Sequence, residues 1–419
     1  MKVKKSHLLE LGVILCVLIN IYFGYFFGVA LTSPFRITNI VIVMMLFLLF
    51  AWRGSNNEYK ALKSRIMPFF FVGAFCLLAE IVYSMYCYSQ TFMEVLVCWE
   101  PYIYLLLVGP LLYVFSSRKA EKILYIIALI TAVGILLRLV QAVAYNVNGL
   151  VIFPTLIEYG VSGIRNDNVR LSMTSLAYVS TVVLFYYVLC SKKKKVYHWI
   201  LLGTNLMAYL YMAQSRVMIA VIGITLIAMY WAKVKPKNRQ LWVLGILLVL
   251  CIILGCTDYL SDYVSSFSVD SEFGGGSTLT RLLAIEYYWN SPYRSPILGM
   301  GFINEGDYLR YLILHRTNTS MQAYYSDIGV LGLYFNLGLI GIALYAYFFA
   351  RLFKALRLGL AKDPGPEKIL IVGFFTYYLF SSVSLLILVA SSIFSVPFIW
   401  AYAEIYIYRI NKLYCGNGV

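Results

Sequence analysis

Charged residues are scarce in this chain. Of its 419 residues, only 13% are Asp, Glu, Lys or Arg, whereas 61% are hydrophobic and 17% are aromatic. About a quarter of the residues in a soluble globular protein are charged, so the composition excludes that class. Several apolar stretches continue for about 20 residues, the length that crosses a hydrocarbon core of roughly 30 Å. The composition therefore predicts a protein that crosses a membrane several times.

The chain also lacks the spacing that marks a metal site or a disulfide framework. Its eight cysteines are scattered, mostly in apolar stretches, and no two of them form a CxxC pair. We expect them to pack as small hydrophobic side chains. Gly299 and Gly301 have no strand–turn–helix context, so they are not a nucleotide-binding fingerprint. We therefore expect neither a metal nor a cofactor.

Acidic residues are too few to balance the basic ones. The chain has 34 basic and 19 acidic residues, which gives a net charge of +15. In a soluble protein this surplus would suggest nucleic-acid binding. Here 25 of the 34 basic residues lie in short segments between apolar stretches or at the termini. Cations in such segments orient a membrane protein and contact anionic membrane lipids, so nucleic acid is not an expected partner.

The apolar stretches predict an all-α polytopic membrane protein with about twelve transmembrane helices in a single domain, residues 1–419. The basic segments between them all fall on one side, which is therefore the cytoplasm. Both termini lie on that side, and the first stretch is interpreted as an uncleaved span rather than a signal peptide. The predicted spans are 8–30, 36–52, 66–88, 93–115, 123–145, 170–190, 197–213, 217–232, 241–256, 329–350, 369–389 and 391–409.

Lysine is missing from the predicted outer side, whereas arginine is not. All 18 lysines fall in predicted cytoplasmic segments, but nine of the 16 arginines do not. A guanidinium is planar and grips phosphate with two parallel hydrogen bonds, which an ammonium cannot do. This distribution favours an anionic, phosphorylated ligand on the outer side. The nine arginines are Arg36, Arg138, Arg165, Arg170, Arg216, Arg281, Arg294, Arg310 and Arg316.

The longest predicted connection is an extracytoplasmic loop, residues 257–328. A loop of roughly 70 residues is usually functional or disordered. A glycine run at 274–276 precedes a helix-like stretch from Thr280 to Trp289, and a second amphipathic stretch runs from Asp307 to His315. We therefore expect a partly helical loop rather than a disordered one.

This loop contains two candidates for a catalytic base. His315 is the only histidine outside the predicted cytoplasmic segments, and a neutral imidazole can take a proton from a hydroxyl group. Glu286 follows Arg281 by five residues and is the second candidate. The alternatives are a surface histidine beside Arg316 and a local ion pair of Glu286. For Arg310 and Arg316 the alternative is an ion pair with Asp307 or Glu305.

Two arginines fall inside or at the end of predicted spans, where charge is costly and usually functional. Arg138 lies in the fifth span and Arg216 opens the eighth. The alternative is that their side chains reach the membrane interface. The acidic residues that could pair with them are Glu80, Glu94, Glu100 and Glu404.

Glycines are concentrated in the tenth predicted span. Small residues on a transmembrane helix let a neighbouring helix approach closely. We expect this packing role for Gly329, Gly332, Gly338 and Gly341.

Three stretches around the long loop resemble the O-antigen polymerase and O-antigen ligase superfamily of bacterial envelope glycosyltransferases. The first is Tyr211–Arg216, which ends in Ser-Arg before an apolar span. The second starts at Arg281–Glu286 and continues through Trp289 to Ser295–Phe302. The third is Tyr324–Gly332, which leads into the tenth span. The three stretches cover the C-terminal half of the chain.

The resemblance implies a GT-C-like fold of many transmembrane helices with its active site on the outer face. It also implies an undecaprenyl-diphosphate-linked oligosaccharide donor, transferred to a sugar hydroxyl without metal or nucleotide. Arg216 and Arg281 match the arginines of the family that would bind the donor diphosphate, and the resemblance offers Arg165 or Arg170 as a third. One departure concerns the base, because Asn318 occupies the asparagine of a family His-Asn pair while His315 lies three residues earlier.

Arg294 and Arg138 complete the candidate substrate-binding set. The leading hypothesis is a polymerase of lipid-linked repeat units for a capsule, exopolysaccharide or O-antigen, at the outer face of the bacterial inner membrane. A ligase that transfers the glycan to a lipid or protein acceptor is the first alternative, and a flippase for lipid-linked oligosaccharides is the second. The candidate protein partners are a chain-length regulator and a flippase of the same pathway.

Overall fold

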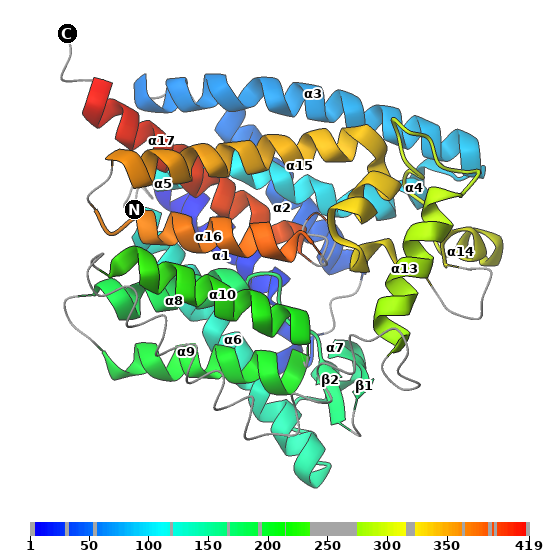
Figure 1. Ribbon diagram of the computed structural model, residues 1–419, viewed down its shortest axis with the longest axis horizontal. Coiled ribbons are helices and arrows are strands. Elements are labelled where there is room, and N and C mark those ends of the chain that lie inside the picture. The colour runs from blue at the N-terminus through cyan, green and yellow to red at the C-terminus, as the bar shows by residue number, and fades with distance from the viewer. Residues whose placement is uncertain are drawn as a thin grey trace.

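The computed structural model describes residues 5–29, 33–52, 57–117, 120–165, 168–191, 195–213, 215–234, 275–315, 323–362, 365–383, 388 and 392–415. Most helices run side by side along one long axis and form a bundle (Figure 1). Its α-helices are α1 (Lys5–Asn20), α2 (Ser33–Trp52), α3 (Asn57–Tyr88), α4 (Phe92–Trp99), α5 (Val108–Ser117), α6 (Ala120–Asn148), α7 (Pro154–Gly160), α8 (Ala177–Cys190), α9 (Val196–Ala208), α10 (Arg216–Lys233), α13 (Gly275–Trp289), α14 (Tyr308–His315), α15 (Gly329–Lys362), α16 (Lys368–Ser381) and α17 (Val396–Cys415).

Shorter helical turns join several of these helices. The 3₁₀ turns are η1 (Phe23–Phe27), η2 (Glu100–Leu107), η5 (Tyr325–Asp327) and η6 (Ile393–Ser395). A π-helical turn, η3 (Tyr209–Ala213), follows α9 directly. Such turns are frequent at functional sites, and this one leads into the Ser215–Arg216 motif.

Helices occupy the positions of the predicted spans, except that span 241–256 lies outside the described residues. In the described part of the chain, four helical segments are long and apolar enough to cross a membrane, namely Lys60–Tyr88, Phe92–Ser116, Ala120–Asn148 and Gly329–Lys362. The expectation of a mostly helical protein is therefore confirmed, and its apolar helices are compatible with a polytopic membrane protein. The count of about twelve spans stays a prediction, as does the GT-C-like arrangement.

One element departs from the predicted all-α fold. β1 (Val161–Arg165) and β2 (Asn168–Leu171) form a two-stranded antiparallel sheet, with Val161 opposite Leu171 and Arg165 opposite Asn168. The side chain of Asn146 on α6 pairs with β2 as a further strand would, because its amide donates to Val169 O at 3.2 Å and its carbonyl accepts from Val169 N at 2.9 Å. This amide occupies hydrogen-bonding groups that a two-stranded sheet leaves open.

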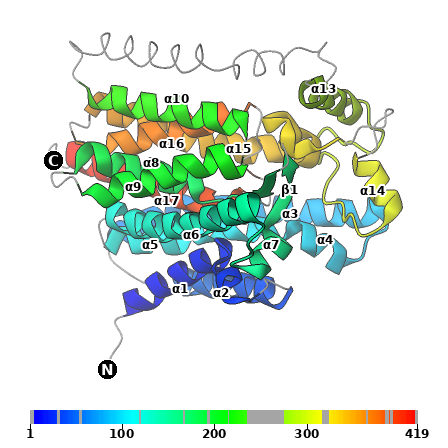
Figure 2. The same ribbon diagram turned by 90° about the horizontal axis from the view of Figure 1, so that it is seen from below.

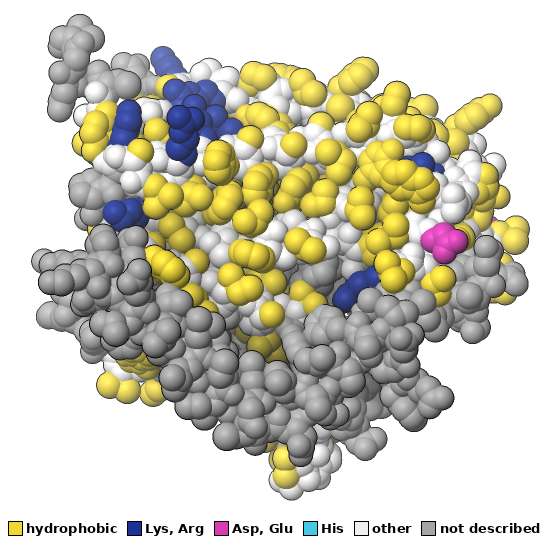
Figure 3. Space-filling view, viewed as in Figure 1, with side chains coloured by type: hydrophobic (Ala, Val, Ile, Leu, Met, Phe, Trp, Pro, Cys, Tyr) yellow, Lys and Arg dark blue, Asp and Glu magenta, His cyan; other side chains and the backbone are white. Residues whose placement is uncertain are grey.

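The surface of the bundle has the pattern of a membrane protein. Hydrophobic side chains cover the middle of the face shown in Figure 3, and Lys and Arg side chains gather at one end of it. On α3, Phe71, Phe75 and Val82 are all exposed. The helix α1 begins, and α17 ends, at the end of the bundle opposite α13 and α14 (Figure 2). The apolar middle is suited to lipid contact.

A buried ion pair joins α15 to α17. Arg351 donates to both carboxylate oxygens of Glu404, from Nε and from Nη2, at 2.5 Å each. Glu404 is 1% exposed and also accepts from Trp400 Nε1 at 3.4 Å. A two-point guanidinium–carboxylate contact of this kind fixes the relative rotation of the two helices.

Removing one partner should therefore destabilise the bundle. We expect Glu404→Ala to lower the free energy of unfolding by about 1.5–3 kcal/mol, because the half-buried Arg351 guanidinium loses its two hydrogen bonds to a carboxylate. Thermal unfolding of the detergent-purified protein measures the effect. The double substitution Arg351→Met/Glu404→Met should recover most of the loss, and Glu158→Ala on exposed α7 is the control. A Glu404→Ala protein as stable as the control would contradict the structural role of the pair.

Candidate functional site

The helix α15 is broken near its beginning, and a loop fills the break. Gly338 has φ 55° and ψ −145°, which interrupts the helical backbone. Loop 295–301 then hydrogen-bonds to the open backbone on both sides of it. Met300 N donates to Phe335 O and Gly301 N donates to Asn336 O, both at 2.8 Å, while Leu339 N donates to Pro296 O at 3.1 Å. Backbone groups of a membrane-embedded helix need such partners because lipid supplies none.

Glycine is required where the loop meets the break. Gly299 and Gly301 have positive φ values of 63° and 75°, which favour glycine. A Cβ on Gly299 would lie 2.5 Å from the carbonyl carbon of Asn336, and a Cβ on Gly338 would overlap the carbonyl of Ile297. The two backbones approach this closely only because both positions lack a side chain. The Ser295–Phe302 motif therefore has a structural task in the fold.

The same loop is attached to α3 and to the beginning of α4. Gln90 donates from Nε2 to Phe302 O at 2.8 Å and accepts from Asn304 N at 2.6 Å. Ser84 Oγ accepts from Phe302 N at 2.8 Å, and Asn304 Nδ2 donates to Glu94 O at 3.1 Å. Residues more than 200 positions apart in the chain thus hold the loop between two helices.

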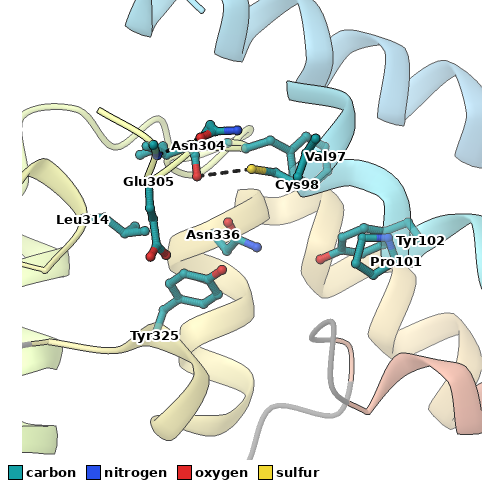
Figure 4. Close-up of a pocket in the computed structure, with 13 residues that line it drawn as sticks. Val97, Cys98, Pro101, Tyr102, Asn304, Glu305, Leu314, Tyr325 and Asn336 are labelled. Carbon is teal, nitrogen blue, oxygen red and sulfur yellow. Dashed lines mark hydrogen bonds between the residues drawn. The ribbon is translucent and has the colours of Figure 1, made fainter. Parts of the chain in front are cut away.

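A cavity of about 300 Å³ lies between η2, the end of α4, and this loop (Figure 4). Its wall combines apolar side chains with a few convergent polar groups, the usual composition of a small-molecule site. Burial raises the pKa of Tyr325 to about 12, so its hydroxyl keeps its proton at neutral pH. The polar lining side chains are Tyr102, Asn304, Glu305, Tyr325 and Asn336.

His315 lies beside this cavity but does not line it. The side chain is buried, with Nδ1 2.8 Å from Ala323 O and Nε2 3.1 Å from Glu305 Oε1. A carbonyl oxygen only accepts, so Nδ1 donates to Ala323 O, and the contact of Nε2 with Glu305 Oε1 is favourable when one of these two atoms carries a proton. The Tyr311 and Tyr324 rings lie 4.8 Å from the imidazole on either side.

Glu305 is a site residue that the sequence did not single out. It lines the cavity and contacts His315, whereas the sequence offered it only as an ion-pair partner of Arg310 or Arg316. Nothing in the ten-residue separation of Glu305 and His315 indicates this contact. The other candidate base, Glu286, is exposed on α13 and does not line the cavity.

Arg310 has two carboxylate partners. The predicted contact with Asp307 is present at 3.5 Å, and Nη2 lies 2.7 Å from Glu94 Oε1. The hydrogen bond that Arg310 donates to Glu94 raises the pKa of Arg310 above its usual value. This pair ties α14 to α4. Glu94 and Glu404 were expected near Arg138 or Arg216, and the structure corrects this, because Glu94 binds Arg310 and Glu404 binds Arg351.

Arg294 and Arg281 have side-chain donors that no group in the described part of the chain fills. The Arg294 guanidinium lies over Trp289 at 4.9 Å and over Tyr334 at 5.3 Å, so aromatic rings hold it instead of a carboxylate. Its Nε and Nη1 are buried without a hydrogen-bond partner, and so is Nε of Arg281 on α13. Buried unfilled donors are rare in proteins and need an explanation. An anionic ligand would fill them.

Two other predicted arginines bind backbone carbonyls. Arg170 on β2 donates to Ala213 O from Nε at 3.1 Å and from Nη2 at 2.6 Å, which attaches the β-hairpin to the π-helical turn before Arg216. Arg138 is fully buried and donates to Ile21 O at 3.0 Å and to Ser172 O. Their predicted contact with substrate stays a prediction, and the structure gives both a positioning role.

The remaining predicted residues are placed only in part. Arg165 ends β1 and Arg216 begins α10, but their side chains lie outside the described part of the structure. Arg316 and Asn318 lie outside it altogether. Their roles therefore stay predictions.

A glycine-to-alanine substitution, which adds one methyl group, tests the close contact at the break in α15. We expect Gly338→Ala to cost roughly 1–3 kcal/mol of stability from the strained backbone alone. Overlap with the Ile297 carbonyl should also detach loop 295–301. Limited proteolysis and thermal unfolding measure the two effects. The matched control is Gly223→Ala on α10, where an added Cβ meets nothing within 4 Å. Equal behaviour of the two variants would refute the close contact.

Part of the chain that contains this site matches a known protein family. Residues 200–346 match the family model described as O-Antigen ligase. The match begins in α9, includes α13, α14 and the cavity loop, and ends beyond the break in α15. No curated protein matches the chain. Members of this family are glycosyltransferase-like enzymes, and the similarity of residues 200–346 to them supports a relationship to the superfamily of O-antigen polymerases and ligases.

Proposed function

We propose that this protein polymerises oligosaccharide repeat units linked to undecaprenyl diphosphate into a surface polysaccharide, on the outer face of the inner membrane. The proposal rests on the two sides of one helical segment, Tyr334–Asn336. One side contacts an arginine, and the other faces the cavity. Arg294, with its unfilled donors, lies over the rings of Tyr334 and Phe335. The next residue, Asn336, faces the cavity that contains Glu305.

A glycosyl transfer between two lipid-linked glycans needs both environments. The donor contributes a diphosphate, which leaves as an anion and requires positive charge nearby. The acceptor contributes a neutral sugar with a reactive hydroxyl. Successive side chains of a helix point about 100° apart, so the segment can present an arginine-lined surface on one side and the cavity on the other.

The arginines supply the charge that the leaving group needs. Arg281 belongs to the matched family segment and has an unfilled donor, and Arg294 lies beyond the end of α13 with two more. A guanidinium can hold two phosphate oxygens at once. As negative charge develops on the bridging oxygen of the diphosphate, these preorganised donors stabilise the transition state more than the bound donor.

A ligase would use the same donor surface and would differ only in the acceptor. A flippase would move the lipid-linked sugar across the membrane without extending it. The attachment of the loop to α3, α4 and the break in α15 favours a fixed catalytic surface over one that rocks between two openings. A flippase and a chain-length regulator would then be partners that supply the substrate and set its final length.

The direct test is transfer activity of the purified full-length protein in liposomes that contain a lipid-diphosphate-linked repeat unit. We expect a ladder of longer glycans on a gel. A single added glycan on a different acceptor would indicate a ligase. A donor that stays unextended but becomes accessible on the opposite leaflet would indicate a flippase.

Arginine substitutions test where the diphosphate binds. We expect Arg281→Ala to lower the transfer rate by about 10²–10³-fold, the usual effect of losing one donor to a developing anion, and Arg216→Ala to reduce it as well. Arg281→Lys should restore only part of the rate, since an ammonium cannot bind two oxygens in parallel. Arg357→Ala is the control, because Arg357 is exposed near the far end of α15. Wild-type rates in Arg281→Ala and Arg216→Ala would reject this donor site.

A further inference from the structure

The cavity contains no positive charge among the described residues that line it. Its polar groups are phenols, amides and the single carboxylate of Glu305. Phosphate is therefore poorly matched to this cavity, whereas sugar hydroxyls can donate to and accept from each of these groups. The volume of about 300 Å³ lies at the lower end of small-molecule sites, which suits one or two sugar rings.

Among the described residues, Glu305 is the one carboxylate that lines this cavity. The side chain of Glu305 is 52% exposed, and Figure 4 shows its carboxylate gathered with the Asn336 amide and the Tyr325 hydroxyl. His315 is 3% exposed and is confined by Tyr311 and Tyr324, so its ring cannot itself touch a molecule in the cavity. Glu305 can therefore contact a molecule in the cavity directly, whereas His315 can act only through Glu305.

We infer that the cavity binds the acceptor sugar and that Glu305 accepts the proton from the attacking hydroxyl. His315 positions the Glu305 carboxylate and then takes the proton from it. This inference rests on the proposed glycosyl transfer and names its acceptor subsite and its base. Glu305 is the catalytic residue because it faces the sugar, and His315 is a positioning residue because it acts through Glu305. The sequence-based choice of His315 as the direct base changes accordingly.

The tautomer of His315 gives the proton a destination. Nδ1 donates to Ala323 O, so Nε2 is the ring nitrogen that can share a proton with Glu305 Oε1, 3.1 Å away. When Glu305 takes up a proton, that proton can pass to Nε2, and the resulting imidazolium forms an ion pair with the regenerated carboxylate. Nε2 lies directly against Glu305 Oε1, so the proton passes between these two atoms without an intermediary.

The step is balanced in atoms and charge. The O–H bond of the acceptor breaks and its proton goes to the Glu305 carboxylate. The acceptor oxygen forms a bond to the anomeric carbon of the donor, and the bond from that carbon to the diphosphate breaks. The electron pair leaves with the diphosphate, whose charge the arginines on the other side of Tyr334–Asn336 stabilise. No oxidant, reductant or further reactant is required.

The experiment separates donor binding from transfer. Full-length protein in nanodiscs is first titrated with a fluorescent lipid-diphosphate-linked repeat unit, and transfer to a short oligosaccharide acceptor is then measured. We expect Glu305→Gln to bind the donor as wild type does but to transfer about 10²–10⁴-fold more slowly, the usual contribution of a general base. Glu158→Gln on exposed α7 is the matched control and should be unchanged in both measurements.

Two further variants distinguish a base from a merely structural carboxylate. Glu305→Ala should regain activity when formate is added, because a small carboxylate can enter the cavity and take the proton. His315→Gln should lower kcat with little change in the KM of the acceptor. Asn336→Leu should instead raise that KM and leave donor binding intact.

Three results would overturn the inference. They are normal transfer by Glu305→Gln, loss of donor binding in that variant, or an inactive Glu305→Ala that formate does not restore. Loss of transfer in Glu286→Gln together with an active Glu305→Gln would assign the base to the other predicted carboxylate. A wild-type protein that extends no donor at all would reject the proposed glycosyl transfer itself, which is a distinct outcome.

Discussion

The structure depends on how the break in α15 is filled. A helix interrupted at Gly338 leaves backbone N–H and C=O groups that lipid cannot satisfy. Loop 295–301 supplies these hydrogen bonds, and three glycines with positive φ allow the two backbones to approach. Everything at the candidate site follows from this contact. It fixes the wall of the cavity at Gly301 and Phe302. It also keeps the rings of Tyr334 and Phe335 within contact distance of the Arg294 guanidinium.

The second constraint is how the few charges are paired. Arg310, Arg351 and Arg409 each contact a carboxylate, and these pairs connect α14 to α4, α15 to α17, and α17 to α6. Arg281 and Arg294 have no ion pair with a carboxylate among the described residues, and each has a buried donor without a hydrogen-bond partner there. Both side chains are partly buried, and a cation without an acidic partner in a membrane protein points to a ligand. The same fold thus uses some arginines as connectors and keeps others available for an anion, while the neutral cavity lies a short distance along the helix.

The sequence predicts the helices well because their signal is local. Apolar stretches of membrane length, and the helix-like segments in the long loop, correspond to helices from α1 to α17. The β-hairpin was missed because its strands are short and half polar, and one of its partners is the side chain of Asn146. The glycines of the tenth span were interpreted as packing residues, and neighbouring backbone does lie against Gly329 and Gly332, whereas Gly338 breaks the helix. Residue type alone does not distinguish these two uses.

The site was harder to predict because its contacts join distant parts of the chain. Asp307 lies three residues from Arg310, so their contact could be proposed from spacing, but Glu94 is 216 positions away and could not. Glu305 contacts His315 only because α14 turns back toward the loop that precedes it. The hydrophobic pattern of the sequence does not predict this turn. The chemistry of the side chains limits the candidate site residues to arginines, histidine and carboxylates. Only the fold shows which of these residues lie at the same cavity.

The most direct measurement is a cryo-electron microscopy map of the full-length protein in nanodiscs, bound to a phosphonate analogue of a lipid-diphosphate repeat unit and to a short oligosaccharide acceptor. The account predicts phosphorus density within hydrogen-bond reach of Arg281 or Arg294 and outside the cavity. It also predicts sugar density in the cavity, with a hydroxyl facing Glu305. Phosphate density inside the cavity, or a cavity that stays empty while the sugar binds elsewhere, would contradict it.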